Sequence, residues 1–261
     1  MKTKNKNTFS AKESKRLKRL LARNATEKPT KAVKSRPQDR SQALAARSRA
    51  RLSYSRFRAQ NEFLYSHSSS EANDFFSEDS FREYHAVYEK IADKWPQKPI
   101  NHTLTSETSG RLVVADIGCG SRAQLRDAFP SHFVHSFDLV ADSPHVTAAD
   151  MCSLPLDADS CDVAVFCLSL MATNLAHALS EANRVLKAGA RLIIVEVASR
   201  FQPITEQQFA RQMTQHFGFK LREQRHLSSD NFFVFFEFQK TAKCSQSLPQ
   251  ITLKSCAFKK R

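Results

Sequence analysis

The run "RLVVADIGCGS", residues 111–121, decides the fold, because an apolar stretch changes there to a carboxylate followed by two glycines. A short, continuous apolar run is typical of a strand that is buried on both faces. Glycines directly after such a strand let the backbone turn sharply and approach a bound molecule closely. We therefore expect a strand that ends at Ile117, with Gly118, Cys119 and Gly120 forming the turn into a helix. This arrangement favours a nucleotide-like cofactor as the bound molecule.

Strand-like and helix-like segments alternate after this run. The strand-like runs are "HFVHSFD" (132–138), "HVTAAD" (145–150), "CDVAVFC" (161–167) and "ARLIIVEV" (190–197), and helices are expected near 124–129, 174–186 and 205–217. This alternation predicts right-handed crossovers and a mostly parallel sheet that is covered by helices on both faces. Two further strand-like runs, 219–227 and 231–240, predict an antiparallel pair at one edge of the sheet. The expected fold is a doubly wound, Rossmann-like α/β domain.

The basic charge of the chain is concentrated in its first part. Residues 1–60 hold 19 Lys and Arg against 3 Asp and Glu, which leaves 21 basic and 23 acidic residues for the rest of the 261-residue chain. Such a segment, with few aromatic residues, buries too little apolar surface to fold alone, so we expect a largely disordered basic arm over residues 1–51. Counterion release favours nucleic acid as its partner over an anionic membrane surface. A tail that only improves solubility is the alternative.

A helical segment is expected between this arm and the sheet. Phe81, Tyr84, Tyr88, Ile91 and Trp95 recur at spacings of three and four, which is one stripe of an amphipathic helix. We favour core packing for this stripe over a ligand-binding role, and the neighbouring His85 is an ordinary surface histidine by this criterion alone. The predicted organisation is a basic arm at 1–51, a helical lid at 52–109, the α/β domain at 110–242 and a loose basic tail at 243–261.

The cysteines and the apolar stretches exclude several classes of protein. The six cysteines form no C-x-x-C pair and no cysteine–histidine spacing typical of zinc, so we expect no metal site and free thiols of a reducing compartment. No apolar stretch has the length of a membrane span, so we expect no membrane association. The lysine and arginine cluster "KRLKR" favours nuclear import. A mitochondrial presequence stays open as an alternative, because the arm contains serine and few acidic residues.

Acidic residues lie at the carboxyl ends of the predicted strands, which meet along one edge of a parallel sheet. Asp116 lies two residues before Gly118, at a depth that suits a cationic or amine-bearing ligand better than a pyrophosphate. Asp138 ends the second strand, where a carboxylate accepts hydrogen bonds from ribose hydroxyls; a helix cap or turn aspartate is the alternative. Asp150, at the end of the third strand, is placed to accept from an adenine amino group, and Met151 offers a polarisable packing surface.

The fourth strand predicts the acceptor side of the same crevice. It ends at Cys167, and residues 168–174 follow at the edge where an acceptor would lie. Cys167 as a nucleophile is the alternative, but its apolar neighbours raise the pKa of a thiol, so we favour a role in the wall of the cofactor pocket. No triad or carboxylate pair stands out elsewhere, and no catalytic residue is predicted.

The glycine turn itself allows two kinds of cofactor. Gly118, Gly120 and Ala123 fit the relaxed G-x-G-x-x-A pattern of dinucleotide sites, which is a weak signal alone. Together with Asp116 the motif becomes D-x-G-C-G, which is typical of S-adenosylmethionine methyltransferases. A nicotinamide-dependent dehydrogenase is therefore the least favoured of the possible functions.

Several segments together carry a specific resemblance. They are "FRAQNEFLY", "KWPQKPI", "VVADIGCG", "FDLV", "DMCSLPL", "DVAVFCLSLMATN", "EANRVL", "EVASRF" and "NFFVFFEFQK", and over roughly residues 52–241 they resemble the ribosomal RNA-processing protein 8 family, known as nucleomethylin in animals. The resemblance implies a nucleolar class I methyltransferase that uses S-adenosylmethionine to methylate N1 of an adenine in large-subunit ribosomal RNA, with a role in pre-ribosomal RNA processing. It further implies the cofactor-binding residues His85, Gly118, Asp138, Asp150, Met151 and Cys167, with His85 as a lid.

Three positions depart from the family pattern. Residues 53–55 replace a Gly-Gly pair, Ser121 replaces an acidic residue, and residues 188–190 replace a P-G-G turn. The first puts the geometry of the N-terminal boundary in doubt, the second an outer contact to the cofactor, and the third only a turn. None of them removes a predicted ligand.

The expected chemistry needs alignment more than proton transfer. A methyl sulfonium is already an activated electrophile, and adenine N1 carries a lone pair, so we expect no dedicated general base. The target base must be exposed by flipping or lie in a loop, where Phe or Tyr side chains stack on it. Two other functions stay open: a cofactor-responsive nucleolar scaffold in ribosome assembly or ribosomal DNA silencing, acting with assembly or chromatin factors, and a protein methyltransferase.

Overall fold

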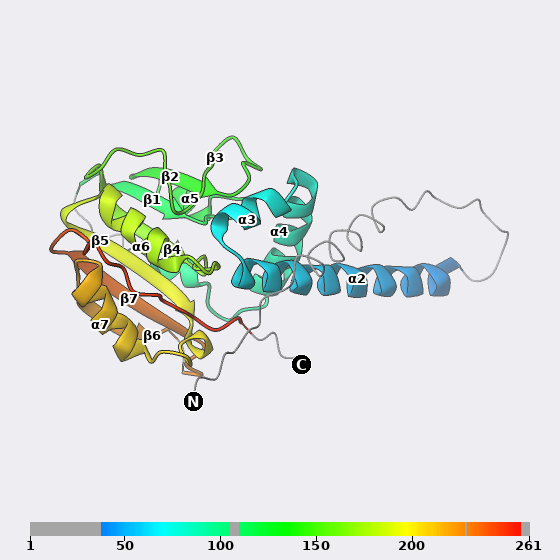
Figure 1. The fold of residues 1–261 in the computed structure, drawn as a ribbon. Helices are drawn as coiled ribbons and strands as arrows, with labels where there is room; N and C mark the ends of the chain where they lie inside the picture. The colour runs from blue at the N-terminus through cyan, green and yellow to red at the C-terminus, as the bar shows by residue number, and fades with distance from the viewer. Residues whose placement is uncertain (1–37, 105–109, 228, 257–261) are drawn as a thin grey trace, which may run out of the picture.

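The computed structural model describes residues 38–104, 110–227 and 229–256. These residues form one seven-stranded sheet with the order β3-β2-β1-β4-β5-β7-β6 (Figure 1). The strands are β1 (Val113–Ile117), β2 (Phe133–Asp138), β3 (Val146–Ala148), β4 (Cys161–Cys167), β5 (Leu186–Val197), β6 (Phe219–His226) and β7 (Phe233–Lys240). The first five strands in this order, from β3 through β2, β1 and β4 to β5, pair in parallel. Strand β7 is antiparallel to both of its neighbours, β5 and β6. The predicted doubly wound sheet with an antiparallel edge pair is confirmed.

Helices cover both faces of the sheet because consecutive strand residues point to opposite sides and both sides are apolar. On one face, Phe166 of β4 packs in a cluster with α6 (Leu175–Val185) and α7 (Glu206–His216). On the other face, Val165 packs in a cluster with Leu125 of α5 (Gln124–Ala128) and with the segment that holds the 3-10 helix η1 (Pro99–His102). A second 3-10 helix, η2 (Ala198–Arg200), follows β5. No helix in the described part of the chain is long and apolar enough to cross a bilayer.

In the part of the chain that the structure describes, three α-helices precede the sheet and form a subdomain with its own apolar cluster. They are α2 (Gln38–Ser66), α3 (Ser69–Phe75) and α4 (Glu78–Ala92). Serine capping boxes begin both α3 and α4, which fixes the two sharp changes of direction between the helices. Phe57, Phe81 and Tyr84 are buried between α2 and α4. The aromatic stripe predicted as a helix therefore forms α4, although Trp95 lies just beyond its end.

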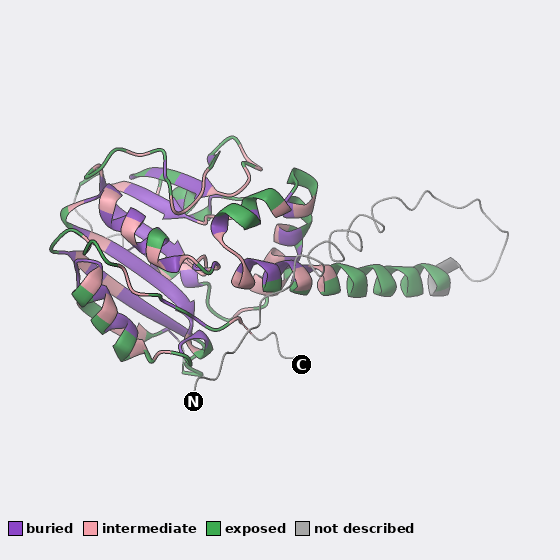
Figure 2. Cartoon of the chain, in the orientation of Figure 1, coloured by how far each residue is buried: buried purple, intermediate pink, exposed green. Residues whose placement is uncertain are grey.

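The expected boundary between arm and lid falls inside α2. This helix begins at Gln38, and residues 41–51 are all exposed, whereas Phe57 is the first buried residue in its described part (Figure 2). The expectation of disorder does not hold for residues 38–51, because their alanines and arginines are strong helix formers that extend a helix anchored by its packed half. Residues 1–37 of the predicted arm lie outside the described residues.

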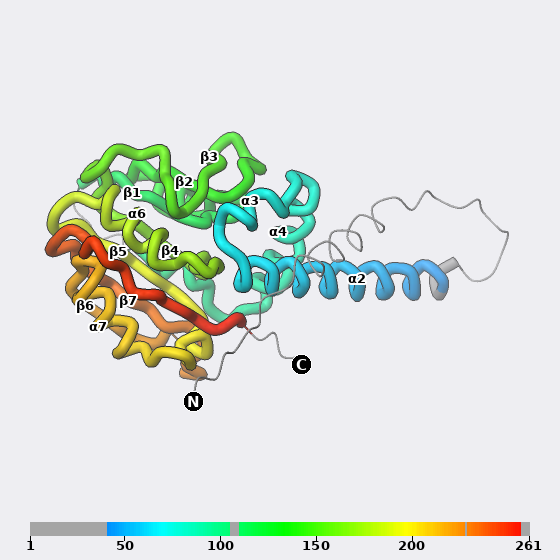
Figure 3. The backbone as a smooth tube through the Cα atoms, viewed as in Figure 1, coloured from blue at the N-terminus to red at the C-terminus, as the bar shows by residue number. Residues whose placement is uncertain are grey.

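The prediction of a loose C-terminal tail was wrong for residues 243–256. This segment has no helix or strand, yet it runs across the α6 and α7 face of the sheet (Figure 3). Ile251 and Leu253 are buried in the main core. The backbone N–H of Lys254 donates to the carbonyl of Arg200 at 2.8 Å, and Arg200 Nε donates back to the carbonyl of Lys254 at 3.0 Å. Isolated apolar residues in an irregular stretch give no periodic pattern, so the sequence did not reveal this packing.

Candidate functional site

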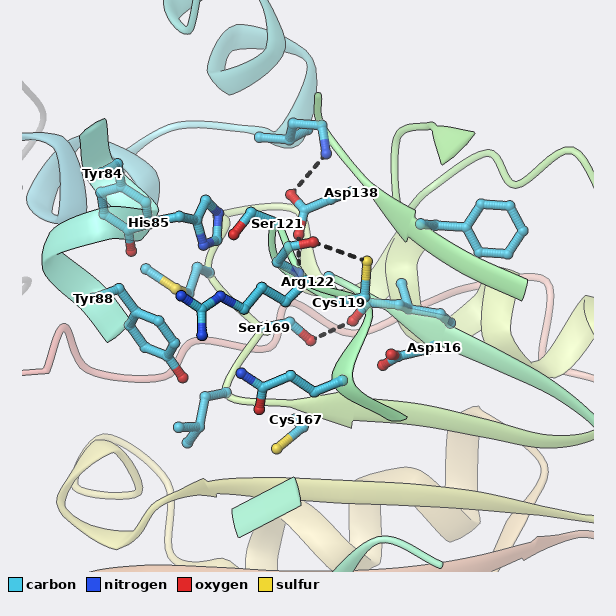
Figure 4. A pocket seen from close by; sticks show the side chains of 18 of the residues that line it. Tyr84, His85, Tyr88, Asp116, Cys119, Ser121, Arg122, Asp138, Cys167 and Ser169 are labelled. Carbon is cyan, nitrogen blue, oxygen red and sulfur yellow. Dashed lines mark hydrogen bonds between the residues drawn. The ribbon is translucent and has the colours of Figure 1, made fainter. Parts of the chain in front are cut away.

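A cavity lies between α4 and the carboxyl ends of β1, β2 and β4 (Figure 4). Its walls come from the glycine turn after β1, the end of β2, the loop after β4 and the three N-terminal helices. Five of the six sequence-predicted cofactor residues line it, namely His85, Gly118, Asp138, Met151 and Cys167. Parallel topology explains this convergence, because it brings the ends of successive strands to one edge.

The glycine turn has a backbone and a packing that only glycine fits. Gly118 and Gly120 have φ angles of 77° and 74°, in the left-handed region. A Cβ atom on Gly118 would lie 2.3 Å from Cβ of Ser169, which is far inside contact distance. The backbone N–H groups of Gly118 and Cys119 donate to the carbonyl of Phe137 at 2.8 and 3.0 Å, and this ties the turn to β2. The turn is therefore held with its backbone against the cavity.

Asp138 supports this turn and also faces the cavity. Its Oδ2 accepts from the backbone N–H of Gly120 at 2.8 Å, and its Oδ1 accepts from the N–H of Leu139 at 2.8 Å. An ionised carboxylate has about four acceptor sites, so each oxygen retains capacity for a ribose hydroxyl. The turn role and the ligand role proposed for Asp138 are thus compatible.

Asp116 provides a buried carboxylate oxygen without a partner. The residue is 2% exposed, and its Oδ2 accepts no hydrogen bond from any described residue. Burial, assisted by the negative charge of Asp138, raises the pKa of Asp116 to about 7. An unsatisfied buried oxygen in a cavity wall costs free energy unless a ligand supplies a donor. This site therefore fits a ligand with a cationic or amine group, as the amino-acid part of S-adenosylmethionine has.

His85 packs on the glycine turn from α4. The Cε1 and Nδ1 atoms of its ring lie 3.3 Å from the place where a Cβ on Gly120 would stand, so the ring covers this glycine directly. Burial lowers the pKa of His85, which favours the neutral imidazole. The role of His85 as a lid over the cofactor stays a prediction.

Glu89, one turn after His85 on α4, is a site residue that the sequence reasoning missed. It forms an ion pair with Arg122 at 2.7 Å and accepts from the Ser121 hydroxyl at 3.2 Å. Ser121 is the residue that departs from the family pattern, and here it connects the turn to α4. The available sequence signal for Glu89 was its spacing of four residues from His85, which places both side chains on one face of the helix.

Among the described residues, Asp150 is the one predicted cofactor residue that does not line the cavity. Its neighbours Ala149 and Met151 do line it. Its Oδ1 accepts from the N–H of Cys152 at 2.8 Å, and its carbonyl accepts from the N–H of Ser153 at 2.9 Å. An aspartate that bonds the backbone two residues ahead stabilises a local turn. The adenine contact of Asp150 stays a prediction.

The loop after β4 is held in a strained conformation by buried charges. Leu168 has a φ of 60°, which is costly for a residue with a side chain. Glu196 Oε1 accepts from the N–H of Leu170 at 3.2 Å, and Arg200 Nη2 donates to the carbonyl of Leu170 at 2.6 Å. Glu196 and Arg200 form an ion pair at 2.7 Å, and each side chain is 1% exposed. The sequence reasoning missed this pair, whose only signal was two opposite charges four residues apart.

Cys167 is the last residue of β4, directly before this loop, and it lines the cavity. Burial, with the nearby carboxylates of Asp116 and Glu196, raises the pKa of its thiol well above the ordinary value. A thiol that stays protonated is a poor nucleophile. The role of Cys167 in the wall of the cofactor pocket stays a prediction.

The same loop is attached to the N-terminal subdomain. Asn174 Oδ1 accepts from the backbone N–H of Ser69 at 3.0 Å, and Asn174 Nδ2 donates to the Ser69 hydroxyl at 3.0 Å. The N–H of Thr173 donates to the carbonyl of His67 at 2.9 Å. The N-terminal helices and the loop after β4 therefore form one continuous wall around the cavity.

Comparisons with known proteins show that the chain is similar to methyltransferases. Residues 43–261 match a family model described as a hypothetical methyltransferase. "Ribosomal RNA-processing protein 8" of Mus musculus is 40% identical over 244 residues, which cover 90% of this chain and 52% of that protein. The "25S rRNA (adenine(645)-N(1))-methyltransferase" of Schizosaccharomyces pombe is 35% identical over 237 residues, which cover 84% of this chain and 73% of that protein. The chain thus spans about half the length of the mouse relative. Among solved structures, a SAM-dependent methyltransferase from Aquifex aeolicus aligns with a TM-score of 0.48 and 13% identity, over 60% of this chain and 98% of that one.

Proposed function

The chain belongs to the ribosomal RNA-processing protein 8 family of methyltransferases, and from this membership we propose that it transfers the methyl group of S-adenosylmethionine to N1 of an adenine in large-subunit ribosomal RNA. The name of the fission-yeast relative supports this reaction. The observation that carries the proposal is the unpaired, buried oxygen of Asp116 beside a glycine turn and a ribose-type carboxylate, Asp138.

The chain has a residue for each part of this cofactor. Asp138 would accept hydrogen bonds from the ribose hydroxyls, and Met151 would pack against the adenine ring. Asp116 and the glycine turn would receive the cationic amino-acid part, and His85 would close the site from α4. When bound, the cofactor supplies a methyl group already activated on a sulfonium.

The residues of the chain contribute alignment rather than proton transfer. Adenine N1 attacks with its own lone pair, so no side chain needs to remove a proton first. The loop that begins at Leu168 is rigid because Glu196 and Arg200 bind both polar backbone groups of Leu170. We propose that this loop forms the acceptor wall and excludes water from the reacting atoms.

The basic N-terminal arm, residues 1–51, supplies affinity for pre-ribosomal RNA in this proposal. Its described part offers Arg47 and Arg51 on one face of α2, and Arg58 continues the same face, because spacings of four and seven return to one side of a helix. All three arginines are exposed, as phosphate contacts require. We therefore also propose a nucleolar location, where this RNA substrate would be found.

The test is a map of reverse-transcription stops on large-subunit ribosomal RNA, because a methyl group on adenine N1 blocks base pairing. Cells with the wild-type protein should show one adenine-specific stop that is lost without it. Asp138→Ala should also lose the stop, whereas Asp142→Ala should keep it, since Asp142 forms a surface ion pair with Arg82 instead. A stop pattern that is independent of the protein would contradict the proposal. Loss of the stop in Asp138→Ala with normal RNA maturation would instead separate a scaffold role from methylation.

A further inference from the structure

Four aromatic side chains form a row that leads from the cavity to the surface. The ring centroids of Tyr88 and Trp95 are 5.9 Å apart, those of Trp95 and Phe233 are 5.1 Å apart, and those of Phe233 and Phe232 are 4.7 Å apart. The interplanar angles are 85°, 70° and 86°, so each ring meets the next edge to face. We call these four residues the aromatic row. Edge-to-face contacts of this kind hold the rings in fixed orientations.

Exposure varies along this row, and the buried Phe233 separates two more accessible rings, Trp95 and Phe232. Tyr88 and Trp95 both line the cavity, and Trp95 is half-buried there. Phe233 is 4% exposed, but Phe232 at the outer end is 40% exposed. A single exposed apolar ring needs no explanation. Phe232 differs because packed rings connect it to the cavity wall.

The aromatic row lies on the acceptor side of the crevice. Phe233 pairs with Val197 at the carboxyl end of β5, whereas the cofactor carboxylate Asp138 ends β2. In the sheet order, β1 and β4 lie between these two strands. Trp95, which packs on Phe233, therefore stands across the crevice from the ribose-binding position.

Positive charge flanks the accessible part of the row. Lys94 and Lys98 are exposed on either side of Trp95 in the chain. Lys98 also lines the cavity, where it forms an exposed ion pair with Asp93 at 3.4 Å. Aromatic faces with neighbouring cations are the combination that binds single-stranded nucleic acid, because bases stack while the cations attract phosphates. This charge pattern argues for an RNA strand over an uncharged ligand.

We propose that the aromatic row is the stacking surface for a single-stranded RNA segment, with Trp95 against the purine that enters the cavity and Phe232 against a neighbouring base. This inference rests on the proposed RNA methyltransferase function and names the residues that receive its substrate. Stacking also favours a base that has already left its duplex, because a paired base cannot reach Trp95.

A direct test uses fluorescence, because Trp95 is the only tryptophan of the chain. A short oligoadenylate RNA, titrated into the full chain with S-adenosylhomocysteine present, should quench this fluorescence. Inorganic polyphosphate, which carries the charge without bases, should leave it unchanged. Phe232→Ala should weaken the apparent affinity for the RNA roughly five- to tenfold. Phe133→Ala is the matched control, since this ring is 52% exposed but lies at the amino end of β2 under Arg111.

Activity measurements separate this inference from the proposed function. Trp95→Ala should lower kcat/KM for a ribosomal RNA substrate by about ten- to a hundredfold, and Trp95→Phe should recover most of it, while calorimetry shows unchanged S-adenosylhomocysteine binding in both. Wild-type values for Trp95→Ala and Phe232→Ala would overturn the inference even though the enzyme methylates RNA. Quenching by RNA in a wild-type protein that methylates no adenine would uphold the stacking surface and contradict the proposed function. Methyl transfer to a peptide with no quenching by RNA would contradict both.

Discussion

At the residue scale, two glycines with nearly the same backbone angles distinguish the effect of backbone strain from the effect of steric collision. Gly118 has a φ of 77° and Gly189 a φ of 78°. An added Cβ would meet Ser169 at 2.3 Å in the first case and only Gln239 Nε2 at 3.8 Å in the second. Alanine would therefore cause backbone strain at both positions, but of these two positions only Gly118 would also have a steric collision.

We expect Gly118→Ala to lower the free energy of unfolding by about 3 kcal/mol and Gly189→Ala by about 1 kcal/mol. Only Gly118→Ala should also abolish S-adenosylhomocysteine binding, because the collision displaces Ser169, whose hydroxyl donates to the carbonyl of Ile117 at 2.6 Å. Urea unfolding and calorimetry measure both effects. Equal losses of unfolding free energy in the two variants would show that the collision with Ser169 does not contribute to the effect of Gly118→Ala.

Asp116 gives the ligand-free protein an unusual dependence on pH. Its pKa is raised from 3.8 to about 7 in the folded state, so the folded protein binds more protons than the unfolded chain between these values. The stabilising effect of the protonated carboxyl is thus complete below about pH 4 and is lost as the pH rises to about 7. The free energy of unfolding should therefore fall by on the order of 4 kcal/mol over this pH range in the wild-type protein. The same fall should be absent in Asp116→Asn. Urea unfolding of both proteins across this range measures it, and parallel pH profiles would contradict the assignment.

Residue roles could be predicted where topology alone creates them. Gly118 and Asp138 follow from their places at strand ends, which a parallel sheet must bring together. Glu89 and Glu196 carried only a weak signal, a spacing of four from His85 and from Arg200, because Arg122 and the N–H of Leu170, which they bind, come from distant segments. Asp150 shows the opposite limit, since a strand-end carboxylate also fits a local turn.

At the scale of elements, the end of β5 determines the shape of the loop after β4. The guanidinium of Arg200 contacts Glu196 and the carbonyls of Leu170 and Lys254 at the same time. It also lies over the ring of Tyr65 from α2, 4.6 Å from the ring centroid. One buried side chain thus joins the loop after β4, the C-terminal segment and the N-terminal subdomain.

Arg200→Lys should therefore cost more than its conserved charge suggests, about 3 kcal/mol in the free energy of unfolding, because a single ammonium cannot reach these partners together. Arg191→Lys is the matched control, since Arg191 is partly exposed and its distance to Glu237 is 3.9 Å; a loss of less than about 0.5 kcal/mol is expected there. Urea unfolding measures the two losses. The Arg200 variant should also lose kcat for RNA while its S-adenosylhomocysteine affinity changes little, and the reverse pattern would place Arg200 outside the acceptor wall.

Elements with a strong period were predictable, and those without one were not. The run 161–167 was predicted as a strand and forms β4 with the same bounds, because its apolar residues face helices on both sides. The first half of α2 carries no apolar face, so composition alone favoured disorder there. The segment 243–256 packs through isolated side chains such as Ile251, and no periodicity reports such contacts.

At the scale of the whole molecule, charge and apolar burial occupy different parts of the chain. The exposed half of α2 projects away from the sheet and carries Arg47, Arg49 and Arg51 (Figure 1). The cavity is surrounded by residues from Leu64 onward. RNA affinity and cofactor binding should therefore be separable by mutation.

Deletion of residues 1–50 should weaken RNA binding and flatten its salt dependence, because each lost phosphate contact lowers the log–log slope by roughly 0.7 for a single strand. S-adenosylhomocysteine affinity should stay nearly unchanged, since burial in the described part of α2 begins only at Phe57. A charge-matched pair tests the same point in the full chain: Arg47→Glu with Arg51→Glu should reduce the slope, whereas Lys220→Glu with Arg222→Glu, at the β6 edge of the sheet, should not. An unaltered slope after deletion would mean that the folded domain supplies the phosphate contacts, and the aromatic row with Lys94 and Lys98 would then be the place to look for them.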